Sequence, residues 1–418
     1  MPDHAAPKTV VIVGAGIVGV STALWLQRRG HHVTLIDKEG PAAGASFGNG
    51  GVLAACSIVP VTGPGLLGKA PRMLLDPNQP LFFKWRYLPR ALPWLLRYLR
   101  HCNAPAVRKR AAALTPVIGD TLAEHQALSM GTGAERFIVP TDYLYLYDTK
   151  AHFEADTFGW DVRRENGFTW DVLDRTALQD YDPCFSPNLA CAVRMGEHGR
   201  ITDPGAYVSA LAQHLEQQGG RVLKSEVTGF MRNGDIVTGV RAGGDTIACD
   251  AAVLCTGAWS APLARALGLS PPLETERGYH LELWEPNIVP RAPVMVASGK
   301  FVITPMDGRL RLAGIVEFGG LEAPPSRAPF ALLKRSVQAA IPGLTWARTE
   351  EWMGHRPSMA DSTPVIGPAP GLKGAFLGFG HDHIGLTAGP KTGRILSQLV
   401  SGTPPNIDLA PFSPTRFH

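Results

Sequence analysis

The feature that most constrains the fold lies near the N-terminus, where an apolar run of strand length opens directly into a glycine-rich turn. Thr9–Val13 (TVVIV) is followed by Gly14–Gly19 (GAGIVG), and apolar residues at helical spacing then continue to Gly30. A second apolar run, Val33–Ile36, ends on Asp37. This order predicts a β-α-β unit whose first turn carries the G-x-G-x-x-G pattern of dinucleotide-binding folds.

The three glycines of this turn have separate physical tasks. Gly14 allows the tight turn, Gly16 lets the backbone approach a pyrophosphate, and Gly19 lets the helix pack closely against the strand. The helix then begins with its free N–H groups directed at the phosphates. Asp37 ends the second strand, where its carboxylate would accept hydrogen bonds from the ribose hydroxyls of an adenosine. An acid at this position favours a dinucleotide without a 2′-phosphate over NADP.

A second glycine-rich stretch, Gly44–Gly51 (GASFGNGG), follows the β-α-β unit and indicates which dinucleotide binds. An NAD-dependent dehydrogenase, the rival interpretation, needs no such loop here, and a flexible surface loop is the purely structural alternative. The longer FAD molecule requires further donors for its pyrophosphate and ribityl chain. Ser46 and Asn49 offer side chains for this task, and Gly50 and Gly51 offer accessible backbone. The stretch therefore predicts FAD.

The remainder of the chain alternates helical and strand patterns and returns to the dinucleotide domain. A helix is predicted over Asp203–Gln218, with its first residue as N-cap and a proline in its first turn. A three-stranded meander follows, at Arg221–Val227, Ile236–Ala242 and Thr246–Cys249. The apolar strand Ala251–Cys255 then leads back toward the cofactor. Strand-like runs between residues 277 and 350 suit an antiparallel sheet over the cofactor.

The length of 418 residues exceeds the size at which one hydrophobic core stops growing, so two joined domains are expected. We predict an α/β fold, α+β overall, in which a Rossmann-like FAD-binding domain is joined to an antiparallel-sheet domain that binds substrate. The predicted division is discontinuous. The FAD-binding domain comprises residues 1–85, 195–275 and 351–418, and the substrate domain comprises residues 86–194 and 276–350.

Composition argues against several other classes. The net charge of +4 is local, since residues 69–110 hold ten Lys and Arg against the single acid Asp76, and no nucleic-acid partner is indicated. The six cysteines include no C-x-x-C pair, so neither a metal site nor a disulfide framework is expected, and a reducing compartment fits. The chain shows no signal-peptide pattern and no apolar stretch of ~20 residues. We therefore expect a cytoplasmic protein.

The segment 81–100 suggests a second location at a membrane surface. Its aromatic residues stand among arginines, the composition of helices that lie in the interface between lipid and water. Pro89 and Pro93 oppose a long helix there. The alternative is that the aromatic rings pack against the substrate domain while the arginines are solvated. A peripheral contact with the inner membrane face is the hypothesis that this segment carries.

These motifs resemble the D-amino-acid oxidase and dehydrogenase superfamily of FAD enzymes, and most closely its bacterial D-amino-acid dehydrogenase branch, which includes glyphosate oxidoreductase and D-hydroxyproline dehydrogenase. The matching stretches extend over nearly the whole chain, at Val11–Asp37, Gly44–Gly51, Leu74–Leu99, Thr275–Leu281, Ser298–Gly314, Trp352–Gly367 and Gly378–Leu386. Their combination is specific to the superfamily and leaves the substrate open. FAD is expected to be non-covalent, because no cysteine or histidine falls in a recognisable attachment motif.

The resemblance implies roles for individual residues. Those at the ADP moiety are Gly14, Gly16, Ile17, Val18, Gly19, Asp37 and Lys38. Those near the pyrophosphate and ribityl chain are Ser46, Asn49, Gly50, Gly51, Thr256 and Gly257, with Val227 at the adenine. Those at the pyrimidine edge of the flavin are Gly380, His383, Gly385, Leu386 and Thr387. A helix N-terminus at that edge would stabilise the negative charge that the flavin gains with a hydride.

Four residues are predicted to act on the substrate. Arg356 matches the position where relatives bind the substrate carboxylate, a task that suits a bidentate guanidinium, with a structural ion pair as the alternative. Tyr279 and His280 lie on a strand expected over the flavin face, where a satisfied core histidine is the competing interpretation. His383 completes the set. Asp382 departs from the family pattern, since an acid beside a reduced flavin is unfavourable unless it points to solvent or substrate.

The predicted activity is oxidation of the C–N bond of a small amino acid or secondary amine, such as a D-amino acid, an imino acid or an N-substituted glycine. Hydride transfer to flavin N5 would give an imine that water hydrolyses, and no side-chain base would be required. Oxygen or a quinone would then accept the electrons. Two alternatives remain open: a flavin-binding regulatory protein without catalysis, and an amine oxidase whose substrate has no carboxylate.

Overall fold

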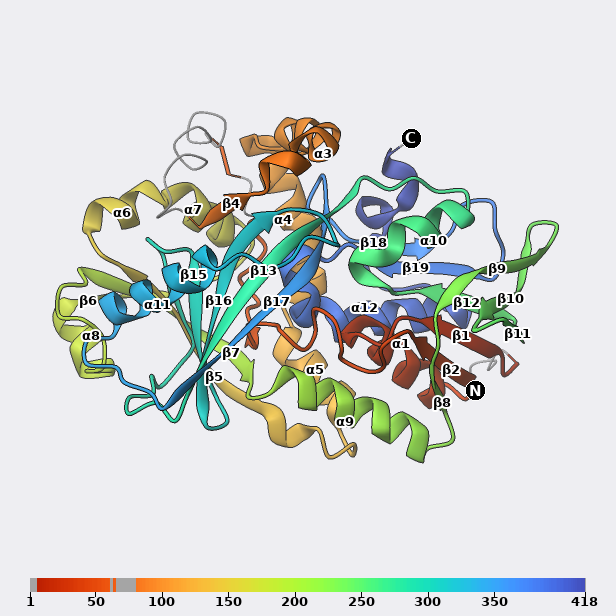
Figure 1. The fold of residues 1–418 in the computed structure, drawn as a ribbon, viewed down its shortest axis with the longest axis horizontal. Helices are drawn as coiled ribbons and strands as arrows, with labels where there is room; N and C mark the ends of the chain where they lie inside the picture. Colours follow the sequence, from red (N-terminus) through yellow and green to blue (C-terminus); the bar gives the residue numbers. More distant parts are fainter. Residues whose placement is uncertain (1–5, 61–62, 65–79, 418) are drawn as a thin grey trace.

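The computed structural model describes residues 6–60, 63–64 and 80–417, which form two halves lying side by side (Figure 1). One half is built on a six-stranded, mainly parallel sheet, and the other on a ten-stranded, mainly antiparallel sheet. A separate three-stranded sheet lies at the outer end of the first half. The predicted fold class, a Rossmann-like domain joined to an antiparallel-sheet domain, is confirmed.

The six-stranded sheet has the N-terminal strand near its centre. Its spatial order is β18 (Val365–Pro368), β19 (Ala375–Phe379), β12 (Ala251–Leu254), β1 (Thr9–Val13), β2 (His32–Asp37) and β8 (Arg221–Lys224). All neighbours are parallel except the pair β18 and β19. The apolar strands β1 and β12 are buried on both faces, as parallel strands covered by helices are. The predicted β-α-β unit is present as β1, α1 (Ile17–Arg28) and β2.

Helices cover this sheet and form its core with it. They are α5 (Thr121–Ser129), α9 (Pro204–Gln217), α10 (Ser260–Ala266) and α12 (Gly385–Val400). Helix α1 packs against both α9 and α12, and a Cβ atom on Gly393 of α12 would lie 2.6 Å from the Cβ of Ser21 in α1. The predicted N-cap Asp203 accepts a hydrogen bond from the backbone N–H of Ala206, so α9 begins as expected.

The meander differs from the prediction at its first strand. Residues Arg221–Lys224 form β8, which joins the six-stranded sheet beside β2. The three-stranded sheet consists of β9 (Val227–Asn233), β10 (Ile236–Ala242) and β11 (Asp245–Ala248). The chain changes sheets at Ser225, whose backbone N–H donates to the carbonyl of Asp37. No glycine or proline marks this change, so the residue pattern alone did not separate the two strands.

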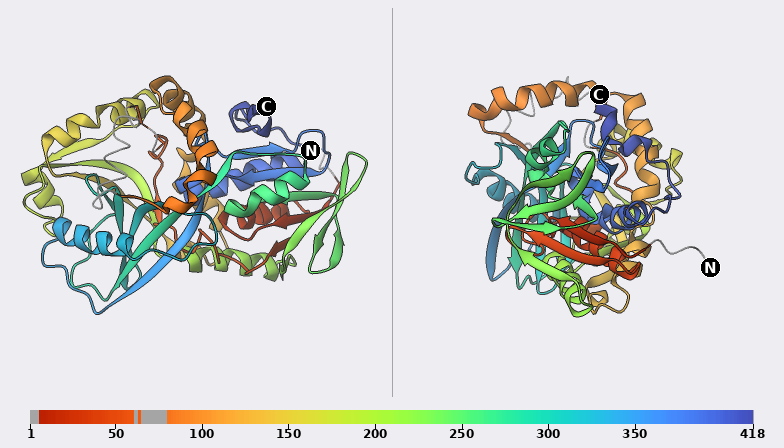
Figure 2. Two further views of the ribbon diagram at one scale, coloured as in Figure 1. Left: turned by 45° about the horizontal axis from the view of Figure 1, so that its top comes forward. Right: turned by 90° about the vertical axis from the view of Figure 1, so that its right-hand side faces the viewer.

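The ten-stranded sheet forms the second half and carries the second large core. Its strands are β17 (Arg348–Met359), β13 (Leu273–Trp284), β16 (Arg309–Phe318), β15 (Phe301–Met306), β14 (Val294–Val296), β5 (Ile138–Tyr147), β7 (Cys191–Ile201) and β3 (Val52–Leu53), with β4 (Leu81–Phe83) on β16 and β6 (Asp171–Asp174) on β7. Helix α11 (Ala328–Ala340) packs across β13 and β16 (Figure 2). The helices of this half are α6 (Lys150–Ala155), α7 (Thr157–Glu165), α8 (Arg175–Tyr181) and α11 (Ala328–Ala340).

Three strands run through the predicted domain boundaries. β7 crosses the boundary at 194/195, β13 that at 275/276, and β17 that at 350/351. β13 and β17 pair along their whole length, from Leu273 opposite Met359 to Trp284 opposite Arg348. The two halves are therefore joined by continuous strands, with no linker at these points. The assignment of residues to two domains stays a prediction.

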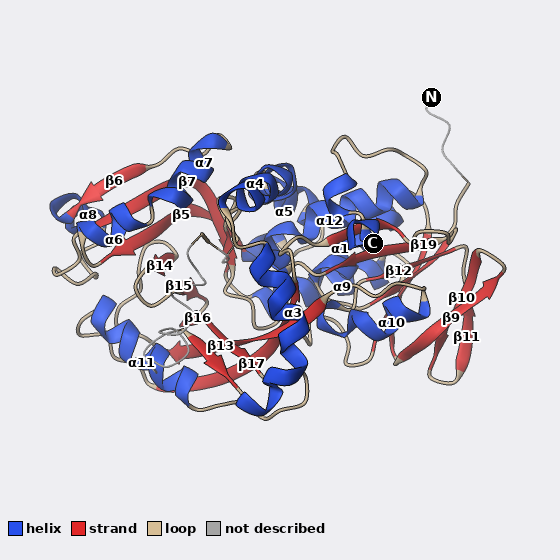
Figure 3. Ribbon diagram, turned by 90° about the horizontal axis from the view of Figure 1, so that it is seen from above, coloured by secondary structure: helices blue, strands red, loops and turns tan. Residues whose placement is uncertain are grey.

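One helix lies over the junction of the two halves, as seen from above in Figure 3. This is α3 (Leu88–Arg100), preceded by the 3-10 turn η1 (Trp85–Tyr87) and followed by α4 (Ala104–Ile118). It forms despite Pro93, and its inner face holds Trp94 and Tyr98, whose rings stack at 4.7 Å. The indole N–H of Trp94 donates to the carbonyl of Pro272 at 3.0 Å. The helix is thereby fixed to the chain just before β13.

Short 3-10 turns complete the described structure, at η2 (Glu135–Phe137), η3 (Gly257–Trp259), η4 (Asp382–Ile384), η5 (Ala410–Phe412) and η6 (Pro414–Phe417). All six cysteines are free thiols. Among the residues that the structure describes, no helix has the length and apolar character needed to cross a membrane. Residues 74–79 of the Leu74–Leu99 resemblance lie outside the described residues.

Candidate active site and cofactor cavity

A cavity of about 1360 Å³ is lined by residues from both large sheets. At one end its wall is the glycine-rich turn after β1, and at the other end it is strands of the ten-stranded sheet. Ligand pockets in proteins commonly measure about 300–1,000 Å³. This cavity therefore has room for a large cofactor with a second molecule beside it.

The glycine-rich turn tolerates no larger residue at two of its positions. Gly14 has a φ of +104°, and a Cβ there would lie 2.4 Å from the carbonyl oxygen of Cys255. A Cβ on Gly19 would lie 1.8 Å from the carbonyl oxygen of Gly14. Both positions require glycine because strand, turn and helix approach each other so closely. Gly14, Gly16, Ile17 and Val18 line the cavity, whereas Gly19 lies behind it.

Asp37 organises the turn as well as lining the cavity. Its carboxylate accepts hydrogen bonds from the backbone N–H groups of Ala15 at 2.8 Å, Glu39 at 2.9 Å and Gly40 at 3.1 Å. Lys38 also lines the cavity, with its ammonium 4.7 Å from the ring centre of Trp259. The acid at the end of β2 thus fixes the backbone that surrounds a bound dinucleotide.

The second glycine-rich loop is tied to the start of α1. The hydroxyl of Ser46 accepts a hydrogen bond from the backbone N–H of Ile17 at 2.9 Å, where α1 has no cap from its own N-cap residue. Asn49 accepts one from Gly51 at 2.9 Å. Ser46, Asn49 and Gly50 line the cavity, and Gly51 does not. A loop held in this way presents its backbone to the cofactor in a fixed conformation.

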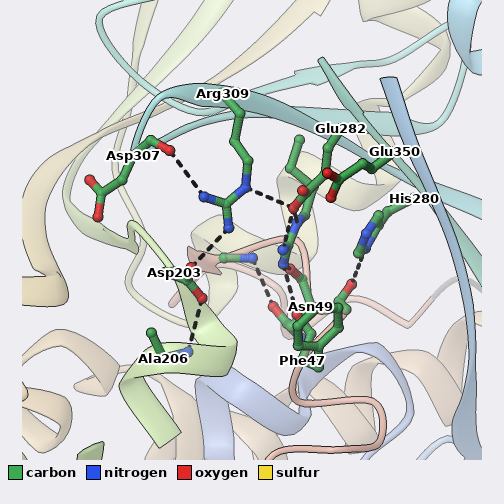
Figure 4. A network of polar contacts seen from close by, with 12 residues as sticks. Phe47, Asn49, Asp203, Ala206, His280, Glu282, Asp307, Arg309 and Glu350 are labelled. Atoms are coloured by element: carbon green, nitrogen blue, oxygen red, sulfur yellow. Dashed lines mark hydrogen bonds and ion pairs between the residues drawn. The ribbon is translucent and has the colours of Figure 1, made fainter. Parts of the chain in front are cut away.

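Strands of the ten-stranded sheet hold the same loop from the other side (Figure 4). The guanidinium of Arg311 donates through Nη1 to the carbonyls of Phe47 at 2.9 Å and Asn49 at 2.6 Å. Its Nε and Nη2 donate to Oε1 of Glu282 at 3.0 and 2.6 Å. Arg309 donates to the same oxygen at 2.8 Å and to Asp203 at 3.0 Å. This buried ionic network connects the second glycine-rich loop, Gly44–Gly51, which we call the cofactor loop, to the strands β13 and β16.

His280 belongs to this network and does not line the cavity. Its Nδ1 lies 3.0 Å from the carbonyl oxygen of Gly48, and its ring stacks on Trp352 at 5.0 Å. Burial, together with the charge of Arg311, lowers its pKa to about 3, so the imidazole is neutral. In this structure its polar contact is with the second glycine-rich loop, and the predicted contact with substrate stays a prediction. The competing interpretation, a satisfied core histidine, describes its surroundings.

Tyr279 lines the cavity, but its hydroxyl is engaged elsewhere. The hydroxyl donates to Glu317 at 2.6 Å and accepts from the backbone N–H of Ser326 at 2.9 Å. Its ring packs edge-on against Phe330 of α11. Burial and the bond to Glu317 raise its pKa to about 12. These contacts orient the phenol toward the core of the ten-stranded sheet.

The N-terminus of α12 forms another part of the wall. Its N-cap residue Ile384 provides no side-chain cap, and Gly385, Leu386 and Thr387 of its first turn line the cavity together with His383. Uncapped N–H groups at a helix start favour an anion or a carbonyl oxygen. Gly380 lies behind the wall, where its φ is +82° and a Cβ would lie 2.5 Å from Cγ of Met359.

Arg356 lies in the cavity wall on β17. The residue is half-buried, and its guanidinium packs against Gly278, where a Cβ would lie 2.7 Å from Cζ; its Nη1 is 3.4 Å from the carbonyl of Ile315. Burial lowers its pKa, although Glu276 and Asp382 act in the opposite direction. Within the described residues Arg356 forms no ion pair. The structural ion pair considered as an alternative is therefore not present among them.

Two carboxyl groups in the same wall were not part of the predicted site. Glu276 accepts a hydrogen bond from the hydroxyl of Ser358 at 3.0 Å, and burial and the neighbouring Asp382 raise its pKa to about 8. Asp382 is 7% exposed and has a φ of +50°. Tyr98 of α3 also lines the cavity, and burial, followed by Glu276 and Asp382, raises its pKa. The sequence marks Asp382 as a departure from the family pattern, whereas no sequence motif distinguishes Glu276 as a site residue.

The remaining predicted residues line the cavity at its dinucleotide end. Val227 of β9, Thr256 and Gly257 face it, and the hydroxyl of Thr256 lies 3.1 Å from that of Ser260. No cluster of three or more His, Cys, Asp or Glu side chains able to hold a metal ion occurs in the described part of the chain. The glycine turn, the fixed loop and the uncapped helix fit an extended dinucleotide.

A cavity that runs from a dinucleotide-binding turn to an antiparallel sheet defines a class of protein: enzymes that hold a dinucleotide cofactor beside a small substrate. Comparison with known proteins identifies the group within this class. The chain belongs to the FAD dependent oxidoreductase family, whose sequence model matches residues 9–399. The predicted cofactor FAD and the predicted enzyme class are thereby confirmed.

Individual relatives match over almost the full length. A D-amino-acid oxidase of Bradyrhizobium diazoefficiens is 40% identical over 417 residues, covering 98% of this chain and 99% of the relative. A D-amino acid dehydrogenase of Allorhizobium ampelinum is 31% identical, covering 98% of each chain. The solved structure of glycine oxidase from Geobacillus kaustophilus shares the fold, with a TM-score of 0.75 at 24% identity, covering 98% and 99% of the two chains.

These comparisons confirm the predicted superfamily and the predicted reaction class, FAD-dependent oxidation of a C–N bond. A flavin-binding protein without catalysis is not favoured by them.

Proposed function

We propose that this enzyme oxidises the bond between the α-carbon and the nitrogen of a D-amino acid. The observation that carries the proposal is Arg356, a half-buried guanidinium in the wall of the cofactor cavity with no ion pair among the described residues. The names of the relatives, D-amino-acid oxidase and D-amino acid dehydrogenase, support the substrate class. Buried charges in proteins are paired, so a carboxylate from a ligand is the expected partner.

The chain's own groups position the reactants in this proposal. Arg356 binds the substrate carboxylate through two parallel hydrogen bonds, which orients the α-carbon. FAD, when bound without a covalent link, supplies the acceptor for the α-hydrogen as a hydride. The N-terminus of α12, with Leu386 and Thr387, lines the cavity, and its free N–H groups would stabilise negative charge that develops on the cofactor there. His383, a third exposed in its side chain, lies beside this wall and contacts substrate or cofactor.

The cofactor is held by residues at three places in the cavity. The turn after β1 and the acid that fixes it hold the ADP moiety, the loop fixed by Arg311 and His280 surrounds the pyrophosphate and ribityl chain, and the start of α12 meets the flavin ring. The proposed binding set comprises Gly14, Gly16, Ile17, Val18, Gly19, Asp37, Lys38, Ser46, Asn49, Gly50, Gly51, Val227, Thr256, Gly257, Gly380, His383, Gly385, Leu386 and Thr387. Gly19, Gly51 and Gly380 do not line the cavity, and their proposed role is to allow the close packing that supports its wall.

Replacement of Arg356 by methionine tests the proposal. The change keeps most of the volume but leaves the substrate carboxylate unpaired in the cavity, a loss of about 2–5 kcal/mol. We expect kcat/KM for the best D-amino acid to fall about 30-fold to a few thousand-fold. The assay is bleaching of the flavin under anaerobic conditions over a panel of D-amino acids, N-substituted glycines and cyclic imino acids.

Two controls accompany this variant. FAD content should be unchanged, since Arg356 lies at the substrate end of the cavity. Arg356→Lys should recover part of the activity, because an ammonium keeps the charge but lacks the two-pronged donor geometry. Full activity of Arg356→Met on its best substrate would contradict the proposal and indicate an amine without a carboxylate.

We also propose that α3 rests on an anionic membrane surface on the cytoplasmic side. Trp85, Leu92 and Leu96 are 58%, 47% and 54% exposed, and all three line the cavity from its outer side. The exposed arginines beside them are Arg86, Arg90, Arg97 and Arg100. Exposed apolar side chains flanked by cations match an interfacial helix.

Binding to vesicles tests the membrane contact. The holoenzyme should sediment with anionic vesicles at low salt and less so at high salt, because the attraction to lipid headgroups is screened. Arg97→Glu should reduce this binding without changing flavin bleaching, because Arg97 is exposed and does not line the cavity. Failure to bind at low salt ends the membrane proposal, and rapid reoxidation by oxygen alone would identify oxygen as the acceptor.

A further inference from the structure

Two carboxyl groups and one guanidinium share the substrate wall of the cavity. Glu276 lies on β13 directly opposite Arg356 on β17, in the register of the two paired strands. Asp382 lies in η4, just before α12, and all three residues line the cavity. The strands and the helix start thus bring together a pair of acids beside the group that is proposed to hold the substrate carboxylate.

The two acids are buried and close enough to influence each other. Glu276 is 6% exposed and Asp382 is 7% exposed. Oδ1 of Asp382 has no hydrogen-bond partner in the described residues, and this side chain lines the cavity. Two adjacent buried carboxyls do not both ionise at neutral pH, so the pair holds one proton and one negative charge.

Several charged or titratable groups face the pair from the surrounding elements. Arg356 faces it from β17, and Tyr98 faces it from α3. His383 follows Asp382 in η4, with its Nδ1 3.6 Å from Oδ2 of that acid. Arg110 of α4 acts on Asp382 from outside the cavity. Burial, followed by the charge of Asp382, raises the pKa of Glu276 to about 8, while Arg356 lowers it.

The singly charged pair and Arg356 together match a zwitterion. An amino acid has one carboxylate and one ammonium, and the wall offers one cation and one shared negative charge next to each other. We propose that Glu276 and Asp382 receive the amino group of the substrate and that Glu276 accepts a proton from it. This inference rests on the proposed function, in which Arg356 binds the carboxylate.

The step is a proton transfer without redox change. One N–H bond of the substrate ammonium breaks, one O–H bond forms on the ionised carboxylate of Glu276, and the electron pair of the broken bond stays on nitrogen as the lone pair of a neutral amine. A carboxylate with an ordinary pKa is a weak base for an ammonium, and the raised pKa of Glu276 removes much of this mismatch. This inference departs from the sequence-based expectation that no side-chain base is required.

Binding of an unreactive pair of ligands tests recognition of the amino group. 2-Aminoisobutyrate has no α-hydrogen and cannot be oxidised, and isobutyrate has the same carbon skeleton without the amino group. At pH 9, where Glu276 is ionised, we expect Glu276→Gln holoenzyme to have a Kd for 2-aminoisobutyrate about 10- to 150-fold above that of the wild type, the effect of losing a charged hydrogen-bond partner. The Kd of isobutyrate should be unchanged or lower. Calorimetry or perturbation of the flavin spectrum measures both.

The pH profile of flavin reduction by a D-amino acid tests the proton transfer. The wild-type profile should rise with pH through a limb near 8, since Glu276 must be ionised to accept the proton. Glu276→Gln should lose this limb and slow reduction about 100-fold or more. Asp382→Asn should move the limb to lower pH, because the neighbouring charge that raises the pKa of Glu276 is gone.

A neighbouring acid provides the matched control. Glu274 lies two residues earlier on β13, its pKa is also raised by burial, and it bonds to Tyr87 outside the cavity lining. Glu274→Gln should leave ligand binding and the pH profile as in the wild type. A Glu276→Gln enzyme with wild-type binding of 2-aminoisobutyrate and a wild-type limb would overturn the inference. If no D-amino acid bleaches even the wild-type flavin, the proposed function itself fails.

Discussion

Replacement of Arg311 by methionine should weaken the binding of FAD, although Arg311 does not line the cofactor cavity. The side chain is 1% exposed and forms two kinds of contact: an ion pair with Glu282 and hydrogen bonds to the carbonyls of Phe47 and Asn49. Each hydrogen bond from a charged donor is worth about 1.5–3 kcal/mol, so the two bonds to the loop set an upper limit of about 3–6 kcal/mol. Ser46 and His280 still hold the loop. We therefore expect the free energy of FAD binding to become less favourable by about the contribution of one such hydrogen bond, about 1.5–3 kcal/mol.

That loss corresponds to an increase of about 10- to 150-fold in the Kd of FAD. The assay is titration of the apoprotein with FAD, followed by quenching of flavin fluorescence. Arg309→Met is the matched control, since Arg309 pairs with the same Glu282 and with Asp203 but donates nothing to the cofactor loop. Both variants break a buried ion pair and should lose stability, whereas only Arg311→Met should bind FAD weakly. Equal FAD affinity in the two variants would refute the reasoning.

Two further predictions concern the backbone and the pH dependence of stability. Gly14→Ala should abolish FAD binding, because its φ is +104° and its Cβ would lie 2.4 Å from the carbonyl of Cys255; Gly40→Ala, with a φ of +105° and no atom near its Cβ, should retain bound flavin in the same absorbance measurement. Burial lowers the pKa of His125 from 6.5 to about 4. Between these pH values the unfolded chain binds a proton that the folded protein does not. The free energy of unfolding therefore decreases by about 1.4 kcal/mol for each pH unit by which the pH is lowered in this range. Denaturation of the holoenzyme between pH 8 and pH 4 should show a slope shallower by this amount in His125→Gln, and an unchanged slope would contradict the assignment.

The elements with local signals were predictable from the sequence. The turn after β1 was recognised because strand, glycines, helix and acid follow one another within one short stretch, and α9 because its cap and its proline stand side by side. β8 was assigned to the wrong sheet, since its pairing with β2 depends on residues far away in the chain. The local residue pattern therefore predicts the presence of a strand or helix better than it predicts which other strand pairs with it.

Site residues that lie within a recognisable sequence motif were predictable, whereas contacts between residues of two different motifs were not. Arg356 and Asp382 were each noticed, one as a family position and one as a departure from it. Their common neighbour Glu276 was overlooked, because only the pairing of β13 with β17 brings it opposite Arg356. His280 was expected near substrate from its motif, yet its ring nitrogen bonds the carbonyl of Gly48, a contact between residues 232 positions apart.

The hold of Arg311 on the cofactor loop has a consequence for biosynthesis. The loop leaves the ribosome early, but the donors to Phe47 and Asn49 lie 264 and 262 residues later in the chain. At about 5–20 residues per second, the nascent protein waits roughly 13–53 s between making the loop and making the arginine that fixes it. The start of α12 at Gly385 is made later still. A nascent chain stalled before Arg311 should therefore have a formed glycine turn yet fail to retain FAD. FAD would then bind only late in translation or after it.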